Sequence, residues 1–169
     1  MHKKNASHLI GHIMYVALYG VLITSTIFLY NSASLAELQY AGWLVLAFGI
    51  IFLVWSAKSR RRGYAENTDG KTLVKGGAYA LVRHPEFLGH ILIIFALVII
   101  SQQWISLITG AILIVLLCLA MVEEEKRNIE KFGDAYRDYI KRVPRINLIA
   151  GIIRLIQSRR KIREQRCNK

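Results

Sequence analysis

Four stretches of the chain carry no lysine, arginine, aspartate or glutamate, and this feature constrains the fold more than any other. They cover residues 9–30, 40–57, 87–100 and 104–122. A helix rises about 1.5 Å per residue, so about 20 apolar residues cross a bilayer core about 30 Å thick. The first, second and fourth stretches are long enough, and the third is short. The sequence predicts an all-α integral membrane protein, a helical bundle of about four transmembrane helices with cytoplasmic C-terminal helices.

The third and fourth stretches are separated only by Ser101, Gln102 and Gln103. We interpret them as a tight helical hairpin whose two ends return to the same face of the membrane. The mean hydropathy of +0.34 and the hydrophobic content of 54% exclude an ordinary soluble domain of this length.

The positive charges are strongly segregated. Of the 23 lysines and arginines, two precede residue 9, seven lie in residues 58–86 and 14 follow residue 122. The positive-inside rule then places both termini and the 58–86 loop in the cytoplasm, at the inner membrane if the protein is bacterial. Anionic lipid headgroups explain the net charge of +12 more simply than a nucleic acid does, so we expect no nucleic-acid partner. Nothing in the pattern indicates an oligomeric state.

The chain is predicted to consist of three regions. Residues 1–60 form an N-terminal transmembrane hairpin, residues 61–145 a catalytic region, and residues 146–169 a basic tail. Asp69-Gly70 and Gly76-Gly77 predict an irregular loop within residues 58–86, and Pro85 suits the first turn of the helix that follows.

The fourth helix is predicted to continue beyond the membrane. Glu123, Glu124 and Glu125 at a helix C-terminus would oppose the macrodipole, so we expect the helix to reach about Phe132. Gly133 would end it and Asp134 would be the next N-cap. A short helix ended by Pro144 would then present one apolar and phenolic face, formed by Tyr136, Tyr139, Ile140 and Val143.

The tail combines an apolar stretch, residues 146–157, with a polybasic continuation. This pattern favours a helix that lies on the inner leaflet. A packed fifth membrane helix is the alternative, which Arg154 and the short length disfavour.

Two polar clusters flank the hairpin, with Tyr79, Arg83 and His84 before it and the three glutamates after it. Because the ends of a hairpin return to one face, these clusters should meet. Cations, carboxylates and phenols together suit a zwitterionic, aromatic ligand. The alternative is that Arg83 reaches the lipid headgroups and Glu123 pairs with Arg127, with no ligand involved.

The order of motifs resembles a known family of membrane enzymes. The segment DGKTLVKGGAYALVRHPEFLG, a hydrophobic hairpin and the segment EEEKRNIEKFGDAYRDYIKRVPR are similar to the isoprenylcysteine carboxyl methyltransferases, which also resemble phospholipid N-methyltransferases. The resemblance covers residues 64–145. It implies a cytoplasm-facing S-adenosylmethionine pocket and a lipophilic substrate that arrives from the bilayer.

The resemblance also implies the residues of the cofactor site. These are Lys71, Thr72, Leu73, Val74, Tyr79, His84, Pro85, Glu86, Phe87 and Glu124. Two positions depart from the family pattern: Phe87 stands where a tyrosine is usual, and Ala120 where the carboxyl methyltransferases carry the arginine that orients the substrate carboxylate. An unpaired carboxylate is costly in a low-dielectric site, so Ala120 argues against a carboxylate acceptor.

Three residues are the candidates for catalysis. Arg83 would hold an anionic group of the substrate, and Glu123 or Glu124 would act as the base for an amine acceptor if burial raised its pKa. Two other functions stay open: a membrane reductase of the sterol-reductase type that uses NADPH, and a non-catalytic membrane scaffold. His8 and His12 are one helical turn apart without a third ligand nearby, so we expect packing and no metal site there.

Overall fold

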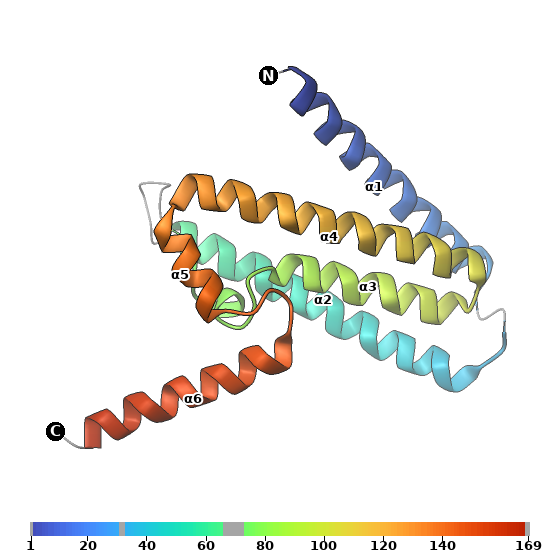
Figure 1. Ribbon diagram of the computed structural model, residues 1–169. Helices are drawn as coiled ribbons and strands as arrows, with labels where there is room; N and C mark the ends of the chain where they lie inside the picture. The colour runs from blue at the N-terminus through green and yellow to red at the C-terminus, as the bar shows by residue number, and fades with distance from the viewer. Residues whose placement is uncertain (1, 31–32, 66–72, 168–169) are drawn as a thin grey trace. The chain divides into compact units, whose positions relative to one another are not determined.

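The computed structural model describes residues 2–30, 33–65 and 73–167, without the side chains of residues 2–10, 159 and 161–167. Within these ranges every regular element is a helix, which confirms the predicted all-α fold (Figure 1). The elements are α1 (His2–Phe28), α2 (Ala36–Ala65), the 3₁₀ helix η1 (Gly77–Ala80), α3 (Pro85–Ser101), α4 (Trp104–Phe132), α5 (Asp134–Arg142) and α6 (Leu148–Cys167).

Three of the described helices, α1, α2 and α4, are long and apolar enough to cross a membrane, and α3 is apolar but has only 17 residues. Only 11%, 22% and 33% of the most apolar windows of α1, α2 and α4 are buried inside the protein. Apolar side chains that are left uncovered on this scale need hydrocarbon around them. The chain is therefore that of a membrane protein, as the sequence predicts.

The chain divides into two compact units, which we describe separately. The transmembrane unit consists of Met1–Ile51 and Gly89–Glu123, and the polar unit consists of Phe52–Leu88 and Glu124–Lys169. The division falls close to the ends of the charge-free stretches in α3 and α4 and within the one in α2. The three regions read along the sequence, 1–60, 61–145 and 146–169, stay a prediction.

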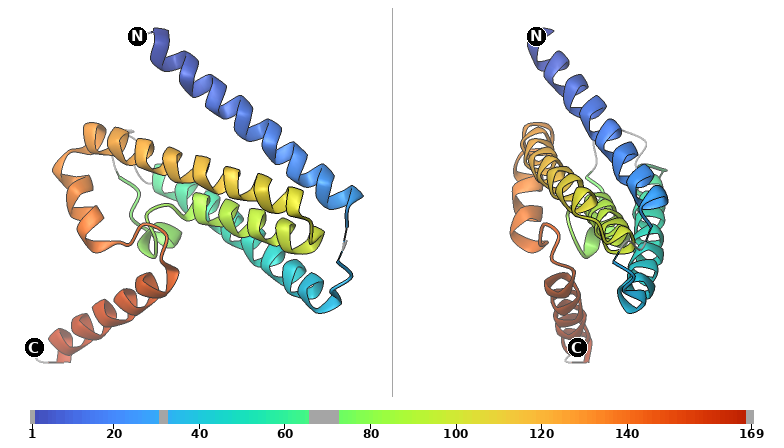
Figure 2. Two further views of the ribbon diagram at one scale, coloured as in Figure 1. Left: turned by 45° about the vertical axis from the view of Figure 1, so that its right-hand side comes forward. Right: turned by 90° about the vertical axis from the view of Figure 1, so that its right-hand side faces the viewer.

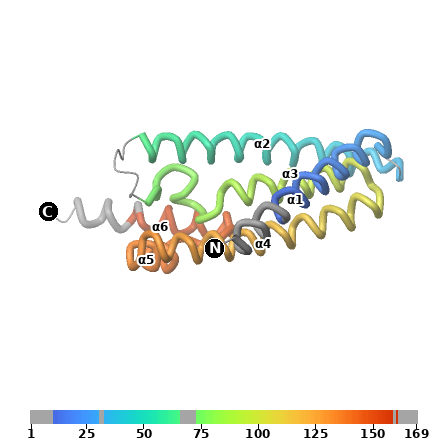
Figure 3. Tube along the Cα trace, turned by 90° about the horizontal axis from the view of Figure 1, so that it is seen from above, coloured from blue at the N-terminus to red at the C-terminus, as the bar shows by residue number. Residues whose placement is uncertain are grey.

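In the transmembrane unit, α3 lies between α2 and α4, and α3 and α4 form the predicted hairpin (Figures 1 and 3). Small residues allow the close approach: a Cβ on Gly42 would lie 2.7 Å from Ile100, and one on Gly110 would lie 2.6 Å from Val98. Such small residues are typical of helix contacts in membranes. A hydrogen bond of 2.7 Å between Ser25 Oγ and Ser106 Oγ joins α1 to α4.

In the polar unit, two helix boundaries differ from the expected ones. Helix α2 continues to Ala65, beyond residue 57, and the three consecutive arginines of this extension are good helix formers. Helix α4 ends at Phe132 as predicted, and α5 turns sharply away from it (Figure 2). The N-cap of α5, however, is Gly133 with φ of 56°, and Asp134 is the first helical residue. The prediction of Asp134 as N-cap was wrong because the tight turn needs a positive φ, which glycine adopts without strain.

Candidate functional site

The segment Arg83-His84 is held in the polar unit by the link between α5 and α6. The amide of Arg83 donates to Pro144 O at 2.9 Å, and the amide of His84 donates to Arg145 O at 3.1 Å. Pro85 is the first residue of α3, where its missing N–H costs nothing. The chain therefore fixes the backbone at the start of α3 from both sides.

Glu125 is the centre of a charged group that we call the Glu125 cluster: Arg83, His84, Glu125 and Arg145. Arg83 Nη1 lies 2.9 Å from Glu125 Oε1, and His84 Nε2 lies 3.2 Å from the same oxygen. Arg145 binds both carboxylate oxygens, with Nε 3.1 Å from Oε1 and Nη2 2.5 Å from Oε2. The side chains of Arg83, His84 and Glu125 are 9%, 2% and 10% exposed. The cluster is thus a buried carboxylate whose oxygens are saturated by protein donors.

The pKa values follow from this environment. Burial alone would raise the pKa of Glu125, but the hydrogen bonds from Arg145 and His84 and the charge of Arg83 outweigh burial and lower it. Burial lowers the pKa of His84 despite its contact with Glu125. Glu125 is therefore ionised at neutral pH, and the cluster is built around that negative charge.

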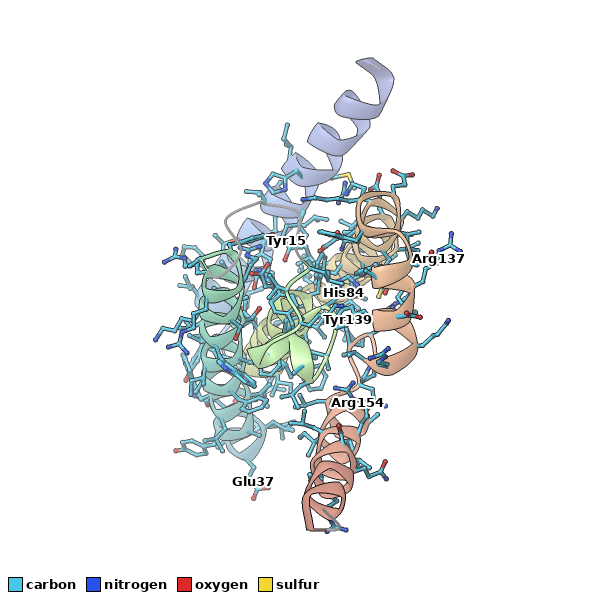
Figure 4. All side chains as sticks on the ribbon, turned by 90° about the vertical axis from the view of Figure 1, so that its left-hand side faces the viewer. Tyr15, Glu37, His84, Arg137, Tyr139 and Arg154 are labelled. Carbon is cyan, nitrogen blue, oxygen red and sulfur yellow. The ribbon has the colours of Figure 1, made fainter. Side chains whose placement is uncertain are left out.

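Beside this cluster is a pocket of about 150 Å³ that we call the Glu124 pocket. It contains residues from α2, the loop before η1, η1 itself, the start of α3, α4 and α5, all within the polar unit. Its lining is Arg60, Tyr64, Leu73, Val74, Tyr79, Arg83, Glu86, Glu124, Asn128, Phe132, Tyr136 and Tyr139. Figure 4 shows His84 and Tyr139 in the interior of the polar unit, whereas Arg137 on the same helix as Tyr139 points outward.

The three consecutive glutamates of α4 have three different environments. Residues in a helix are turned by about 100° from one to the next, so the three side chains point in different directions. Glu124 lines the pocket, Glu125 is buried in its cluster and Glu123 is exposed. Glu124 lies beyond the apolar part of α4, and burial raises its pKa although Arg127 opposes the shift.

The walls of the Glu124 pocket are held by specific contacts. Tyr139 donates its hydroxyl to Tyr79 O at 2.7 Å, which joins α5 to η1. Tyr136 and Tyr139 pack with Val143 into a buried cluster, as the predicted face of α5 requires. Glu86 pairs with Arg60 at 2.8 Å between α3 and α2. Burial raises the pKa of Tyr79, so its phenol stays protonated.

The model of a family described as "Protein of unknown function (DUF1295)" matches residues 2–143. The chain belongs to this family. No curated protein and no solved structure matches the chain.

The family match extends over every residue that lines the Glu124 pocket and ends just before Pro144 and Arg145. The family description assigns no activity. The function therefore has to be inferred from the chemistry of the pocket.

The structure brings together in the Glu124 pocket half of the site residues that the sequence predicted. Arg83 and five predicted cofactor residues line the pocket: Leu73, Val74, Tyr79, Glu86 and Glu124. His84 and Pro85 are buried outside its lining, and the Phe87 ring packs edge-on against His84 with 5.4 Å between centroids. Glu123 does not line it. Lys71 and Thr72 lie outside the described residues.

Sequence reasoning missed three polar residues of this region, Arg60, Asn128 and Arg145. Arg60 was assigned to an irregular loop, whereas it lies on the extension of α2. Asn128 lies one helical turn after Glu124, and this spacing is the signal that could have identified it. Arg145 follows Pro144, and nothing in the local pattern indicates that the chain turns back there to Glu125.

Proposed function

We propose that this protein is an integral membrane methyltransferase that uses S-adenosylmethionine and methylates a lipid or another lipophilic small molecule. One observation carries the proposal: a single pocket gathers five of the residues that resemble the cofactor site of the isoprenylcysteine carboxyl methyltransferases. These five are Leu73, Val74, Tyr79, Glu86 and Glu124. Residues separated by about 50 positions in the sequence thus share one small cavity.

The chemistry of the lining fits this cofactor. The carboxylates of Glu86 and Glu124 suit an ammonium group or ribose hydroxyls, and the guanidinium groups of Arg60 and Arg83 suit a carboxylate. Aromatic rings suit both a purine and a positively charged sulfur, and the pocket has five: Tyr64, Tyr79, Phe132, Tyr136 and Tyr139. Its volume of about 150 Å³ accommodates one part of such a molecule.

The cofactor supplies a methyl group on a sulfonium, so the residues around it have to orient the reactants and need not provide a strong acid. Glu124 is the base for an amine acceptor, because its raised pKa makes it a better proton acceptor than an exposed carboxylate. Arg83 is the candidate for an anionic group. Its buried Nε has no hydrogen-bond partner among the described residues, although its Nη1 pairs with Glu125.

The acceptor is inferred to be lipophilic and not a carboxylate. Ala120, one helical turn before Glu124, offers no counter-ion for a carboxylate. The beginning of α6 exposes a row of isoleucines at helical spacing. This row supports a position of α6 on the cytoplasmic leaflet, and a lipophilic acceptor would enter the site from that leaflet. The row consists of Ile149, Ile152, Ile153 and Ile156.

Binding of the reaction product tests the cofactor. S-adenosylhomocysteine should bind the purified protein in detergent, and Glu124→Gln should weaken the binding by about 10- to 100-fold, as the loss of a charged hydrogen bond of about 1.5–3 kcal/mol predicts. Glu130→Gln, an exposed glutamate on the same helix, is the matched control and should leave the affinity unchanged. Binding of NADPH in place of S-adenosylhomocysteine would instead support a reductase, and binding of neither a scaffold.

Transfer of the methyl group tests the acceptor. Membranes that contain the protein are incubated with methyl-labelled S-adenosylmethionine, and the label is then partitioned among lipid, protein and volatile fractions. We expect label in the lipid fraction, and less of it with Glu124→Gln than with Glu130→Gln. Label in a base-labile protein ester would contradict the interpretation of Ala120.

A further inference from the structure

A second cavity of the polar unit, which we call the basic pocket, has a different charge from the Glu124 pocket. It has a volume of about 290 Å³ and lies between the end of α2 and the segment before η1. Among the described residues that line it, three are cations, Lys58, Arg62 and Lys75, and none is acidic. Its remaining lining residues are Trp55, Ser59, Gly63, Leu73, Val74, Gly76 and Gly77.

The three cations have no carboxylate partner among the described residues. The ion pairs among the described residues of the polar unit use other side chains, and Arg60, also on α2, is paired with Glu86 on the wall of the Glu124 pocket. Lys58 and Arg62 are four residues apart and therefore lie on one face of α2, where like charges destabilise a helix. A bound anion would remove this repulsion.

The walls of the basic pocket are fixed by close packing between the loop and α2. Ser59 Oγ accepts a hydrogen bond of 3.1 Å from the amide of Ala78. Gly77 has φ of +60°, and a Cβ there would overlap Ser59 Oγ. A Cβ on Gly63 would lie 2.6 Å from both methyl groups of Val74. The cations are therefore presented by a closely packed framework.

The position of Trp55 indicates the depth of the basic pocket relative to a membrane. Trp55 lies at the end of the second charge-free stretch, three residues before Lys58, and is 40% exposed. Tryptophan is enriched where hydrocarbon meets the headgroups. Cations directly beyond such a residue lie at the level of lipid phosphates.

From the cavity, the three cations that its described residues contribute and its place beside Trp55, we infer that the basic pocket binds the phosphate group of a membrane phospholipid. Arg62 and the two lysines hold the phosphate oxygens, and the acyl chains extend past Trp55 into the bilayer. The inference is independent of the proposed activity, although Leu73 and Val74 form walls of both pockets.

Fluorescence of Trp55 tests the inference, because Trp43→Phe and Trp104→Phe leave it as the sole tryptophan of the chain. The probe is dihexanoyl phosphatidic acid, added to the protein in an uncharged detergent. We expect a saturable change in the fluorescence as the lipid is added. The affinity for the lipid should fall at least tenfold when Lys58, Arg62 and Lys75 are all replaced by Gln. Gly76→Leu should also weaken the binding without a change of charge, since Gly76 lines the pocket and a Cβ there meets nothing within 4 Å.

A matched triple variant removes three exposed cations elsewhere in the polar unit: Lys126→Gln, Arg137→Gln and Lys141→Gln. It should bind as the parent does. An equal loss of affinity in both triple variants would overturn the inference, because the lipid would then be attracted by the overall positive charge and not by this pocket. Equal binding of dihexanoyl glycerol would overturn it in favour of acyl chains alone, and equal binding of inorganic phosphate in favour of a soluble ligand. S-adenosylhomocysteine binding, measured on the same samples, reports separately on the proposed function.

Discussion

The Glu125 cluster and the Glu124 pocket are adjacent and contain consecutive glutamates of α4, yet the pKa values of these two glutamates are shifted in opposite directions. Glu125 is surrounded by two arginines and a histidine that saturate its oxygens, and its pKa is lowered. Glu124 lies in an aromatic pocket, and its pKa is raised. A buried carboxylate whose charge is balanced by cations of the protein stabilises the fold. A carboxylate at a cavity whose charge is only partly balanced is available to a ligand.

Arg83 is common to both regions. It pairs with Glu125 through Nη1 and also lines the Glu124 pocket. A substrate anion that binds Arg83 would therefore share it with the Glu125 cluster, and the cluster would keep the guanidinium in position.

The largest expected difference between the two regions is in stability. Glu125→Gln leaves Arg83 and Arg145 without their carboxylate, and removal of one partner of a buried ion pair costs about 3–5 kcal/mol. We expect the lower end of this range, because the Arg145 side chain is 45% exposed. Thermal unfolding in detergent measures the change. Glu124→Gln should leave stability unchanged or raise it slightly, and equal destabilisation by both variants would contradict the comparison.

The contributions of the two glutamates to stability should change in opposite directions as the pH falls. The pKa of Glu125 is lowered from 4.5, so its stabilising contribution is present above that value and is lost as the pH falls through the folded-state pKa. The pKa of Glu124 is raised, so its ionisation destabilises the fold at neutral pH, and this penalty disappears as the pH falls. Unfolding midpoints from pH 7 down to about pH 2 check this difference, because the contribution of Glu125 is lost only below its unfolded-state pKa.

With Glu125→Gln, the loss of stability on acidification should be shallower than in the parent protein. With Glu124→Gln, the difference from the parent should be largest at neutral pH and should shrink on acidification. The same slope in all three proteins would mean that neither pKa is shifted as the environments predict.

The next effect concerns the wall of the Glu124 pocket. Tyr139→Phe removes the hydroxyl that donates to Tyr79 O and leaves a partly buried carbonyl without that donor, a change that costs about 1–3 kcal/mol. Because Tyr79 lines the pocket, binding of S-adenosylhomocysteine should weaken as well. Tyr64→Phe is the matched control, since Tyr64 lines the same pocket but is 55% exposed. The prediction fails if both variants have the same stability.

Much of this arrangement could be predicted from the sequence because it depends on short-range patterns. Four charge-free stretches and a three-residue connection were enough to predict that residues 83–84 and the glutamates meet at the end of a hairpin, and the contact of His84 with Glu125 confirms it. The extension of α4 to Phe132 followed from three glutamates that would otherwise oppose the helix dipole.

The sequence could not predict which glutamate faces the Glu124 pocket. That choice depends on how α4 is rotated against η1 and α5, and a rotation of about 100° exchanges neighbouring residues. The role of Arg145 was equally hidden, because it depends on two backbone hydrogen bonds between residues far apart in the chain, Arg83 to Pro144 and His84 to Arg145. Long-range pairing of this kind leaves no periodic signal.

The smallest expected effect is at the beginning of α6, on the far side of the link that carries Arg145. Arg154 donates to Arg142 O at 2.8 Å and to Ala80 O, and Gly151 approaches Leu81 so closely that a Cβ there would overlap its carbonyl. Arg154→Gln should cost about 1 kcal/mol, since two neutral acceptors lose a charged donor that is partly replaced by water. Hydrogen exchange of the first turns of α6 should therefore be faster, while Arg160→Gln, at an exposed position of the same helix, should change nothing. If Arg154→Gln left exchange in α6 unchanged but weakened S-adenosylhomocysteine binding, Arg154 would belong to the Glu124 pocket and not to the framework beside the Glu125 cluster.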